Sequence, residues 1–322
     1  MKKILCIIGA LLLVFISVLL FRTSSLDNTL WESKQSFYKI NQRQVGNYQD
    51  NKADWENSEI FKKVYLELEN KYNAFICSTW NYDIIDGKPR YEKAQHGDIP
   101  IEYDYYGYSF TVSKNYFNYT PVKDINGNAV QNLLTDDENT LDIIVPYKYK
   151  SDSKLITSIY QEFMFFNNVE IENIYNEALN LGINKKEQKD FIVNIIYVPD
   201  NTEYDVYNPA INHNKIKDCI AIVINCKNYN KVQLNAIANQ GFYVHFDSDN
   251  ESVENEIEST YKENNYEDGY HSTDSVQSLY NEWKHDRIYE TVAIGAVSII
   301  VAVMIVSSAL FIIKKVNKSK KK

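Results

Sequence analysis

The sequence is poor in the residues on which covalent cross-links and most metal sites depend. It has 4 cysteines in 322 residues, and Cys6 falls in an apolar N-terminal run. Cys77, Cys219 and Cys226 remain, and the last two are seven positions apart. On one strand, Cys219 and Cys226 would point to opposite faces and could not bridge. A disulfide between Cys77 and one of them stays open beside three unpaired core thiols, and we expect the fold to rely on burial.

Catalytic motifs are also missing. The chain has no GxxxxGK[ST], HExxH, CxxC or GxSxG sequence, which removes local support for ATP hydrolysis, zinc proteolysis and serine hydrolysis. The histidines are scattered, and His245 alternates with apolar neighbours in YVHFD, which favours a strand histidine over a metal ligand or catalytic base. Asp136 and Asp137 lie in a polar loop without calcium-loop spacing. We therefore expect that the protein is not an enzyme and that it has no catalytic residue, cofactor or metal.

Basic residues are scarce between the two ends of the chain. Nine of the 34 Lys and Arg residues lie before residue 23 or after residue 313, so 25 face 43 Asp and Glu residues over 23–290, a balance of −18. Nucleic acid and anionic lipid repel such a surface. We expect neither as a partner of this middle region, whereas a cationic peptide would be attracted to it.

Long apolar runs occur only at the two ends. Uncharged runs of 18 and 22 residues cover 4–21 and 292–313, and a bilayer core needs about 20 apolar residues as helix. We therefore predict membrane helices at 1–22 and 292–313. The first lacks an A-x-A site and is longer than the usual signal core, which favours an uncleaved signal anchor over a cleaved signal peptide.

The lysines of 314–322 predict a cytoplasmic tail, which we expect to contact anionic lipid headgroups as a stop-transfer anchor. Both termini would then be cytoplasmic, and the central region would be extracellular on the cell membrane. Membrane lipid is accordingly an expected partner.

The region between the apolar runs combines strand and helix patterns. Residues 23–57 are polar and predict a linker or loose helix, and Ser58 could cap a helix over 58–72. Asp-Gly at 86–87 and Asn-Gly at 126–127 are hairpin signals. Further strands are expected at 74–85, 101–113, 141–146, 191–199, 203–209, 219–225 and 241–246, and further helices at 155–166, 171–179 and 231–239. The order lacks a strict βαβ rhythm, which favours an α+β extracytoplasmic domain over 58–273 with a mixed sheet, as one lobe or two.

The segment 274–291 predicts a helical stalk. Ser272, Thr273, Asp274 and Ser275 supply cap residues, and no glycine or proline interrupts the chain before Gly295. Its apolar stripe consists of Val276, Leu279, Tyr280 and Trp283. A helix from 274 to 313 would be about 60 Å long at about 1.5 Å per residue, so we expect a stiff connection to the apolar run.

Tyrosine is abundant, with 26 residues. The cluster of Tyr103, Tyr105, Tyr106 and Tyr108 could form a binding face for a peptide or a sugar, because tyrosine offers a large amphipathic contact area. The competing interpretation is compositional, since Asn, Lys, Ile and Tyr are enriched together, as A+T-rich codons produce.

Several segments, taken in order, resemble the ectodomain of the bacteriocin-associated integral membrane protein family, which belongs with the MacB/FtsX-type permeases of peptide ABC transporters. They include VSKNYFNYTPVKDINGNAV, LDIIVPYKYK and IIYVPDNTEYDVYNP, and they cover 112–130, 141–150, 195–209, 216–225 and 261–283. The resemblance implies a MacB-like extracytoplasmic domain between two membrane helices, moved by a cytoplasmic ATPase. That family continues past the second helix, whereas this sequence stops at Lys322. The resemblance then implies either that a second polypeptide supplies the remaining helices or that this is a derived protein that keeps the sensing or binding domain alone.

Two functions follow as expectations. The first is a non-catalytic, membrane-anchored extracytoplasmic component of an ABC-type bacteriocin or peptide export or immunity system, with ATPase and permease subunits as partners. The alternative is a stand-alone anchored binding protein for a cationic peptide or a cell-wall component.

Overall fold

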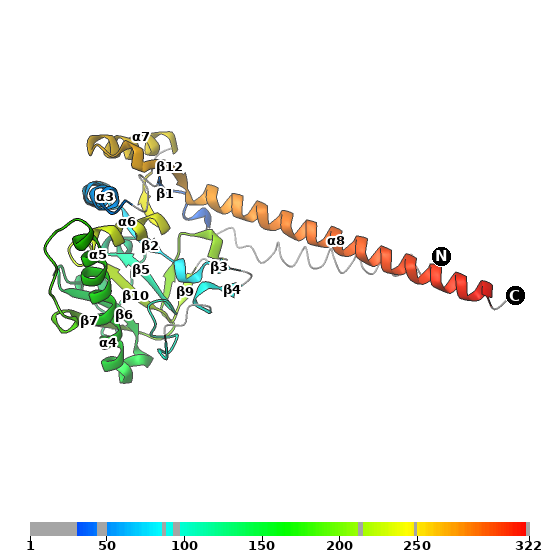
Figure 1. Ribbon diagram of the computed structural model, residues 1–322, viewed down its shortest axis with the longest axis horizontal. Helices are drawn as coiled ribbons and strands as arrows, with labels where there is room; N and C mark the ends of the chain where they lie inside the picture. Colours follow the sequence, from blue (N-terminus) through cyan, green and yellow to red (C-terminus); the bar gives the residue numbers. More distant parts are fainter. Residues whose placement is uncertain are drawn as a thin grey trace. The chain divides into compact units, whose positions relative to one another are not determined.

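The computed structural model describes residues 31–43, 50–85, 88–92, 97–211, 215–247 and 250–319 (Figure 1). The chain divides into two compact units. The larger is Ser33–Leu279, and the smaller combines Met1–Glu32 with Tyr280–Lys322.

An eight-stranded sheet organises the larger unit. Its strand order is β12-β1-β11-β2-β5-β10-β6-β7. Strands β5 and β10 are parallel, as are β6 and β7, and the other neighbours are antiparallel, so the sheet is mixed. The strands are β1 (Phe37–Gln42), β2 (Phe75–Ser78), β5 (Ser109–Ser113), β6 (Thr140–Pro146), β7 (Ile192–Val198), β10 (Ile220–Ile224), β11 (Phe242–His245) and β12 (Tyr270–Ser275). The expected α+β class is confirmed.

Two short hairpins stand outside the large sheet. Strand β3 (Ile84–Ile85) pairs with β4 (Lys88–Pro89), and these strands flank the Asp-Gly turn signal, whose own residues lie outside the described part of the chain. Strand β8 (Glu203–Asp205) pairs with β9 (Lys215–Lys217).

Helices pack against one face of the sheet (Figure 1). They are α3 (Asn51–Tyr72), α4 (Ser153–Phe165), α5 (Ile171–Ala178), α6 (Lys231–Gln240) and α7 (Asn250–Glu263). A π-helical turn over Phe166–Glu170 joins α4 to α5. The core between these helices and the sheet contains isoleucine rows from the central strands, among them Ile220, Ile222 and Ile224 of β10. Burial of these apolar side chains is the main stabilising term.

Strand β5 differs from its neighbours on this helix-covered face. Ser109, Thr111 and Ser113 pair directly with Ile220, Ile222 and Ile224 of β10. Residues that pair directly across two strands point to the same face, so β5 presents hydroxyl side chains where β10 presents isoleucines. The middle of the sheet therefore carries smaller side chains at this strand, which leaves space under the helices.

The opposite face of the sheet is covered by loops and by a cluster of buried rings. Phe75 contacts Tyr116, Tyr207 and Tyr243 at centroid distances of 5.0–6.1 Å. Lys34 lies against this cluster, with its Nζ 4.4 Å from the centroid of the Tyr207 ring. Much of the tyrosine excess is thus core packing.

The structure corrects several local expectations. Residues 37–42, within the predicted polar linker, form β1, because β11 and β12 flank it on both sides and satisfy its backbone groups. Helix α3 begins before Ser58, which is buried inside it. Its N-cap is Asp50, whose Oδ1 accepts from the amides of Lys52 and Ala53 at 3.1 Å each. Helix α7 was not predicted from the sequence.

The predicted cap segment 272–275 belongs to β12, because it pairs with β1. Only its last residue caps a helix, since Ser275 Oγ accepts from the amide of Ser278 at 3.0 Å.

The predicted membrane helices require a second correction. Helix α8 (Val276–Ser319) is 44 residues long and contains the apolar run 292–313. Over the described residues, however, no helix meets the length and apolarity that a membrane crossing requires. On this finding, the transmembrane prediction for 292–313 is wrong over the described residues. The predicted anchor at 1–22 lies outside the described residues.

Candidate functional site

A cavity of about 300 Å³ lies on the helix-covered face of the sheet. Its floor includes Thr111 of β5 and Ile222 of β10, one wall comes from α6, and the other comes from the end of α4 and the π-helical turn. The loop residues around Trp80 and Tyr106 complete it. The space exists where hydroxyl side chains of β5 replace the larger side chains of neighbouring strands.

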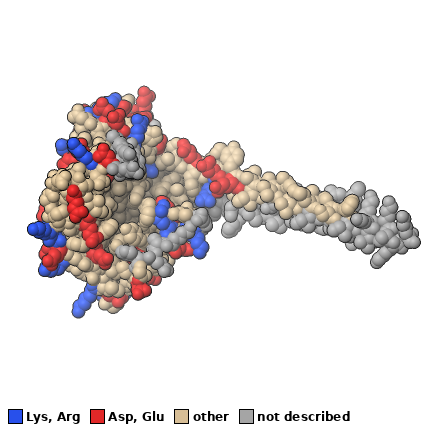
Figure 2. Space-filling view, in the orientation of Figure 1, with Lys and Arg blue, Asp and Glu red and all other residues tan. Residues whose placement is uncertain are grey.

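The lining of the cavity is aromatic and polar but uncharged. Seven of the 16 lining residues are aromatic, six of the others carry hydroxyl or amide groups, and none of these described residues is charged. Figure 2 shows the larger unit hollowed near its middle, with an uncharged surface in the hollow and acidic and basic side chains around it. Burial raises the pKa of both Tyr105 and Tyr106 above the usual tyrosine value, so these hydroxyls stay neutral.

The three hydroxyls of β5 have different surroundings. Ser109 donates to the carbonyl of Tyr105 at 2.7 Å and accepts from Asn81 Nδ2 at 3.0 Å. Ser113 accepts from the amide of Ile76 at 2.9 Å. Thr111 lies between them, is 8 % exposed and lines the cavity, yet its hydroxyl has no hydrogen-bond partner among the described residues. The Thr111 hydroxyl reaches the accessible surface of the cavity, so it is available to pair with a polar ligand group.

Side-chain amides supply further hydrogen-bonding groups on the walls. Gln233 of α6 is half-buried, lines the cavity and has no hydrogen bond to any described residue. Gln240, at the end of the same helix, accepts from Ser78 Oγ at 2.6 Å through its side-chain oxygen, which orients the amide. Asn167 is already used in the structure, since its Nδ2 donates to the carbonyl of Phe163 at 2.7 Å. Gln233 and the Gln240 amide nitrogen are therefore the groups left to meet a ligand.

Trp80 is held in place from outside the cavity. The guanidinium of Arg90 lies 4.0 Å from the centroid of its ring, and Arg90 Nε donates to the Trp80 carbonyl at 3.2 Å. Asp83 lies 3.6 Å from Arg90 Nη2 and balances its charge. Tyr106 is next to Trp80, at a centroid distance of 6.3 Å. These contacts orient an aromatic wall before any ligand arrives.

Asn81 fixes the loop that carries the tyrosines of the cavity. Its Nδ2 lies within hydrogen-bond distance of the carbonyls of Tyr105 and Gly107, at 2.9 and 3.2 Å. The Asp104 carboxylate is buried and accepts from the amide of Tyr106 at 2.9 Å, and it does not line the cavity. These hydrogen bonds fix the conformation of the loop, and Asp104 adds no side chain to the lining of the cavity.

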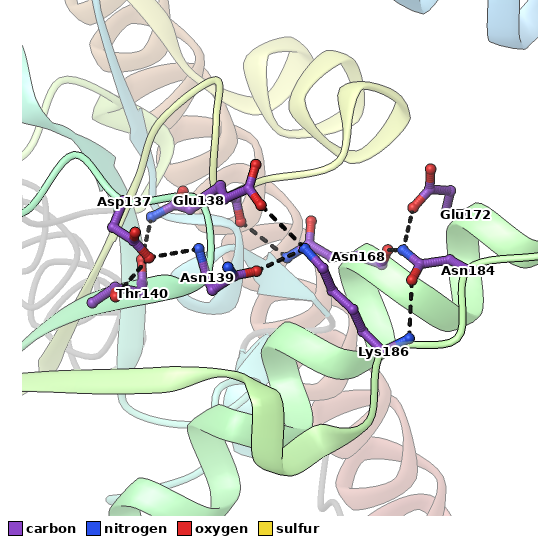
Figure 3. A network of polar contacts seen from close by, with 9 residues as sticks. Asp137, Glu138, Asn139, Thr140, Asn168, Glu172, Asn184 and Lys186 are labelled. Atoms are coloured by element: carbon purple, nitrogen blue, oxygen red, sulfur yellow. Dashed lines mark hydrogen bonds and ion pairs between the residues drawn. The ribbon is translucent and has the colours of Figure 1, made fainter.

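A polar network supports the π-helical turn from behind (Figure 3). Asn184 Nδ2 donates to the carbonyl of Asn168 at 3.2 Å and to Glu172 Oε2 at 2.8 Å. Lys186 Nζ donates to Asn139 Oδ1 at 2.7 Å. The turn that supplies Asn167 to the cavity is thereby tied to the loops next to β6 and β7. π-Helical turns are frequent at functional sites.

The tyrosine cluster predicted from the sequence does not form one face. Tyr105 and Tyr106 line the cavity. Tyr103 instead donates to Asp152 Oδ2 at 2.8 Å, and Tyr108 packs edge-on against Tyr91 at 4.7 Å. Thr111, Gln233 and Gln240 were missed, although a strand that alternates Ser, Thr and Ser with apolar residues was a readable signal of a hydroxyl row.

The residues of the predicted stalk lie in α8 and outside the cavity. Val276 is buried and Leu279 is half-buried, and both belong to the larger unit. Tyr280 and Trp283 belong to the smaller unit, in which Tyr280 stacks on Trp31 at 5.2 Å and on Trp283 at 5.9 Å.

The other residues considered for chemistry have structural surroundings. His245 contacts the rings of Phe37 and Tyr119 at 4.9 and 5.4 Å. Cys77, Cys219 and Cys226 are buried free thiols, so the disulfide alternative is excluded. Within the described ranges, no group of three or more His, Cys, Asp or Glu side chains is arranged to hold a metal ion.

Comparisons with protein-family models, with curated proteins and with solved structures found no match. The resemblance to the bacteriocin-associated permease family stays a prediction without further support. The description of the chain as a transmembrane, ABC-permease-like protein is wrong over the described residues, which contain no membrane-crossing helix. No transporter or bacteriocin-associated relative was found, and a role beside a peptide export or immunity system stays a prediction.

Proposed function

We propose that the larger unit is a non-catalytic binding module that takes a small uncharged ligand in the cavity over β5. The observation that carries this proposal is the Thr111 hydroxyl: the residue is buried, and its hydroxyl faces the cavity without a protein partner among the described residues. The proposal includes neither membrane anchoring nor a division into two lobes.

The composition of the cavity wall selects against charged ligands. Moving an ion out of water requires a counter-charge or several hydrogen bonds to offset the desolvation. No described lining residue carries a charge, and the three tyrosines of the wall have raised pKa values. A ligand with neutral polar groups is favoured, because Thr111 and Gln233 would otherwise stay unpaired beneath it.

The same lining favours binding over catalysis. A threonine hydroxyl becomes a nucleophile only beside a general base, and no His, Lys, Asp or Glu is among the described residues that line the cavity. Burial raises the pKa of the Cys77 and Cys219 thiols to about 12, so neither is a ready thiolate.

The acidic surface supports a second candidate, the capture of a cationic peptide. Helix α7 carries Glu251, Glu254, Glu256, Glu258 and Glu263, in agreement with the −18 balance of the middle region. Such binding is electrostatic and is screened over a Debye length of about 8 Å in physiological salt. Binding in the uncharged cavity should instead respond little to salt.

The test is a blocking variant of the full-length chain. Ala236 is exposed and lines the cavity, so Ala236→Trp should fill its mouth without disturbing the core. Asn239→Trp is the matched control, because Asn239 is exposed on the same helix and does not line the cavity. A panel of neutral, acidic and basic small molecules and of short cationic peptides would be titrated by calorimetry, at two salt concentrations.

We expect a neutral compound to bind the wild type and Asn239→Trp equally, and Ala236→Trp at least tenfold more weakly. Binding of cationic peptides alone, abolished by salt and unchanged in Ala236→Trp, would favour the second candidate and reject the first.

A further inference from the structure

Resting on the proposed function, we infer that the ligand of the cavity is a neutral carbohydrate of one or two pyranose rings. The ring face would lie on the aromatic wall of Trp80 and Tyr106, and the ring hydroxyls would pair with Thr111 and Gln233. Each part of this inference follows from a separate property of the wall.

The aromatic wall suits a sugar ring because of its electrostatics. An aromatic face is negative and attracts positive groups, and the axial C–H groups on one face of a pyranose form a weakly positive, apolar surface. Arg90 orients the Trp80 ring by stacking on it and by hydrogen bonding to its carbonyl. Because the platform is fixed in advance, less entropy is lost when a flat ligand stacks on it.

The polar groups suit a ligand that both donates and accepts at neighbouring positions. Thr111 has one donor and two acceptor sites, and the Gln233 amide has both kinds of group. Vicinal sugar hydroxyls present the same alternation at their edge. A flat aromatic compound without such hydroxyls would cover Thr111 and shut it off from water without pairing its hydroxyl, which is unfavourable.

The size of the cavity and its uncharged lining further limit the kinds of carbohydrate that could bind. About 300 Å³ is at the small end of ligand sites, which begin at about 300 Å³, so a long chain could place only a terminal unit inside. The uncharged lining disfavours sugar phosphates, uronates and free amino sugars. The neutral hexoses and N-acetylhexosamines remain.

The experiment compares matched probes on the full-length chain. Glucose, N-acetylglucosamine and their disaccharides would be titrated against glucuronate, glucosamine, indole and a dipeptide with both ends blocked. We expect at least one neutral sugar to bind, and its uronate or amino counterpart to bind at least tenfold more weakly.

Thr111→Val removes the hydroxyl and keeps the shape. It should weaken sugar binding about three- to tenfold, in line with the net value of one hydrogen bond. Thr157→Val is the control, because Thr157 is a half-buried threonine of α4 that does not line the cavity. Gln233→Met is a second test, since its half-buried side chain has no hydrogen bond to another described residue. Thermal unfolding of each variant would show that its fold is intact.

The outcomes separate the two proposals. Binding of indole or the blocked dipeptide in place of the sugars, still prevented by Ala236→Trp, would overturn the carbohydrate assignment and keep the binding function. Sugar binding that is equal in wild type, Thr111→Val and Gln233→Met would also overturn it. If no neutral probe binds, or if a neutral probe binds Ala236→Trp as tightly as the wild type, the proposed function itself fails.

Discussion

Asn168 Nδ2 donates a hydrogen bond to the backbone carbonyl of Asn228 at 2.9 Å. Asn168 belongs to the π-helical turn that forms one wall of the cavity, and Asn228 shortly precedes α6, which forms the other. Asn228 in turn donates from its side chain to the carbonyl of Thr140 in β6 at 2.9 Å. One chain of hydrogen bonds therefore fixes both walls of the cavity to the sheet.

Asn168→Ala should destabilise the protein and loosen the cavity. The carbonyl of Asn228, a residue that is 1 % exposed, would lose this partner, and an unsatisfied buried group costs about 1–3 kcal/mol. Urea unfolding of the full-length chain measures the change. Asn239→Ala, an exposed position on α6, should stay within about 0.5 kcal/mol of the wild type. Equal stability of the two variants would show that the Asn168 contact does not hold the walls together.

Gly241→Ala should be destabilising for a steric reason. A Cβ at this position would lie 2.2 Å from the Cys77 carbonyl oxygen, at the point where α6 passes into β11 and Cys77 donates its amide to Gly241. The backbone would have to shift, and overpacking of this kind costs about 1–3 kcal/mol. Gly182→Ala is the matched control, because a Cβ there meets nothing within 4 Å. Thermal unfolding of both variants would decide, and a neutral Gly241→Ala would contradict the close approach.

Lys34 should make stability depend on pH between about 8 and 10.5. Burial lowers the pKa of Lys34 from 10.5 to about 8, with Asp205 opposing the shift. In this window the unfolded chain binds the proton that the folded protein has released, so stability rises with pH, in total on the order of 3 kcal/mol.

Buried cysteines act in the opposite direction above pH 9, because their raised thiol pKa values keep protons on the folded state. The measurement is therefore the difference between wild type and Lys34→Met in urea unfolding at pH 7, 8, 9 and 10. That difference should shift in favour of the wild type as pH rises. A difference that stays constant with pH would mean that Lys34 is not desolvated.

Three thiols should be unreactive in the native protein. Cys77, Cys219 and Cys226 are buried and unpaired, and burial raises the pKa of each thiol. A thiol-specific reagent at pH 8 should therefore label three more cysteines in denaturant than in native buffer, because only the thiolate reacts. Mass spectrometry after digestion identifies them. Fast native labelling of Cys77 would place it at the surface.

Local sequence patterns predicted the strands and helices that are apolar along their own length. The runs at 141–146, 191–199 and 219–225 became β6, β7 and β10, and the stretch 231–239 became α6. These elements could be predicted because the buried positions of a regular helix or strand recur at a fixed spacing in the sequence. Cys219 and Cys226 flank β10 and are unpaired, in agreement with the prediction that they could not bridge each other.

Polar elements required the tertiary structure. Strand β1 reads FYKINQ and is internal to the sheet only because β11 and β12, distant in sequence, pair with its two edges. Helix α7 has many glutamates and is stabilised by the few residues that reach the core, Val253, Ile257 and Tyr261. In both cases long-range hydrogen bonds and burial outweighed weak local preference.

Some residues of the candidate site could likewise be predicted from the sequence, whereas others required the tertiary structure. Tyr105 and Tyr106 stood out in the sequence because they lie in a dense tyrosine cluster, and the cavity contains both. The alternation of Ser, Thr and Ser around Thr111 could be read in the sequence, but nothing local placed Thr111 beside Gln233, which is far away in the chain. The pairing of β5 with β10 and the packing of α6 over the sheet bring them to one cavity. Composition by itself determined that the protein is rich in aromatic residues and that its middle region is acidic. The tertiary packing decided which aromatic rings and hydroxyls line the uncharged cavity, because the lining depends on contacts between residues that are far apart in the sequence.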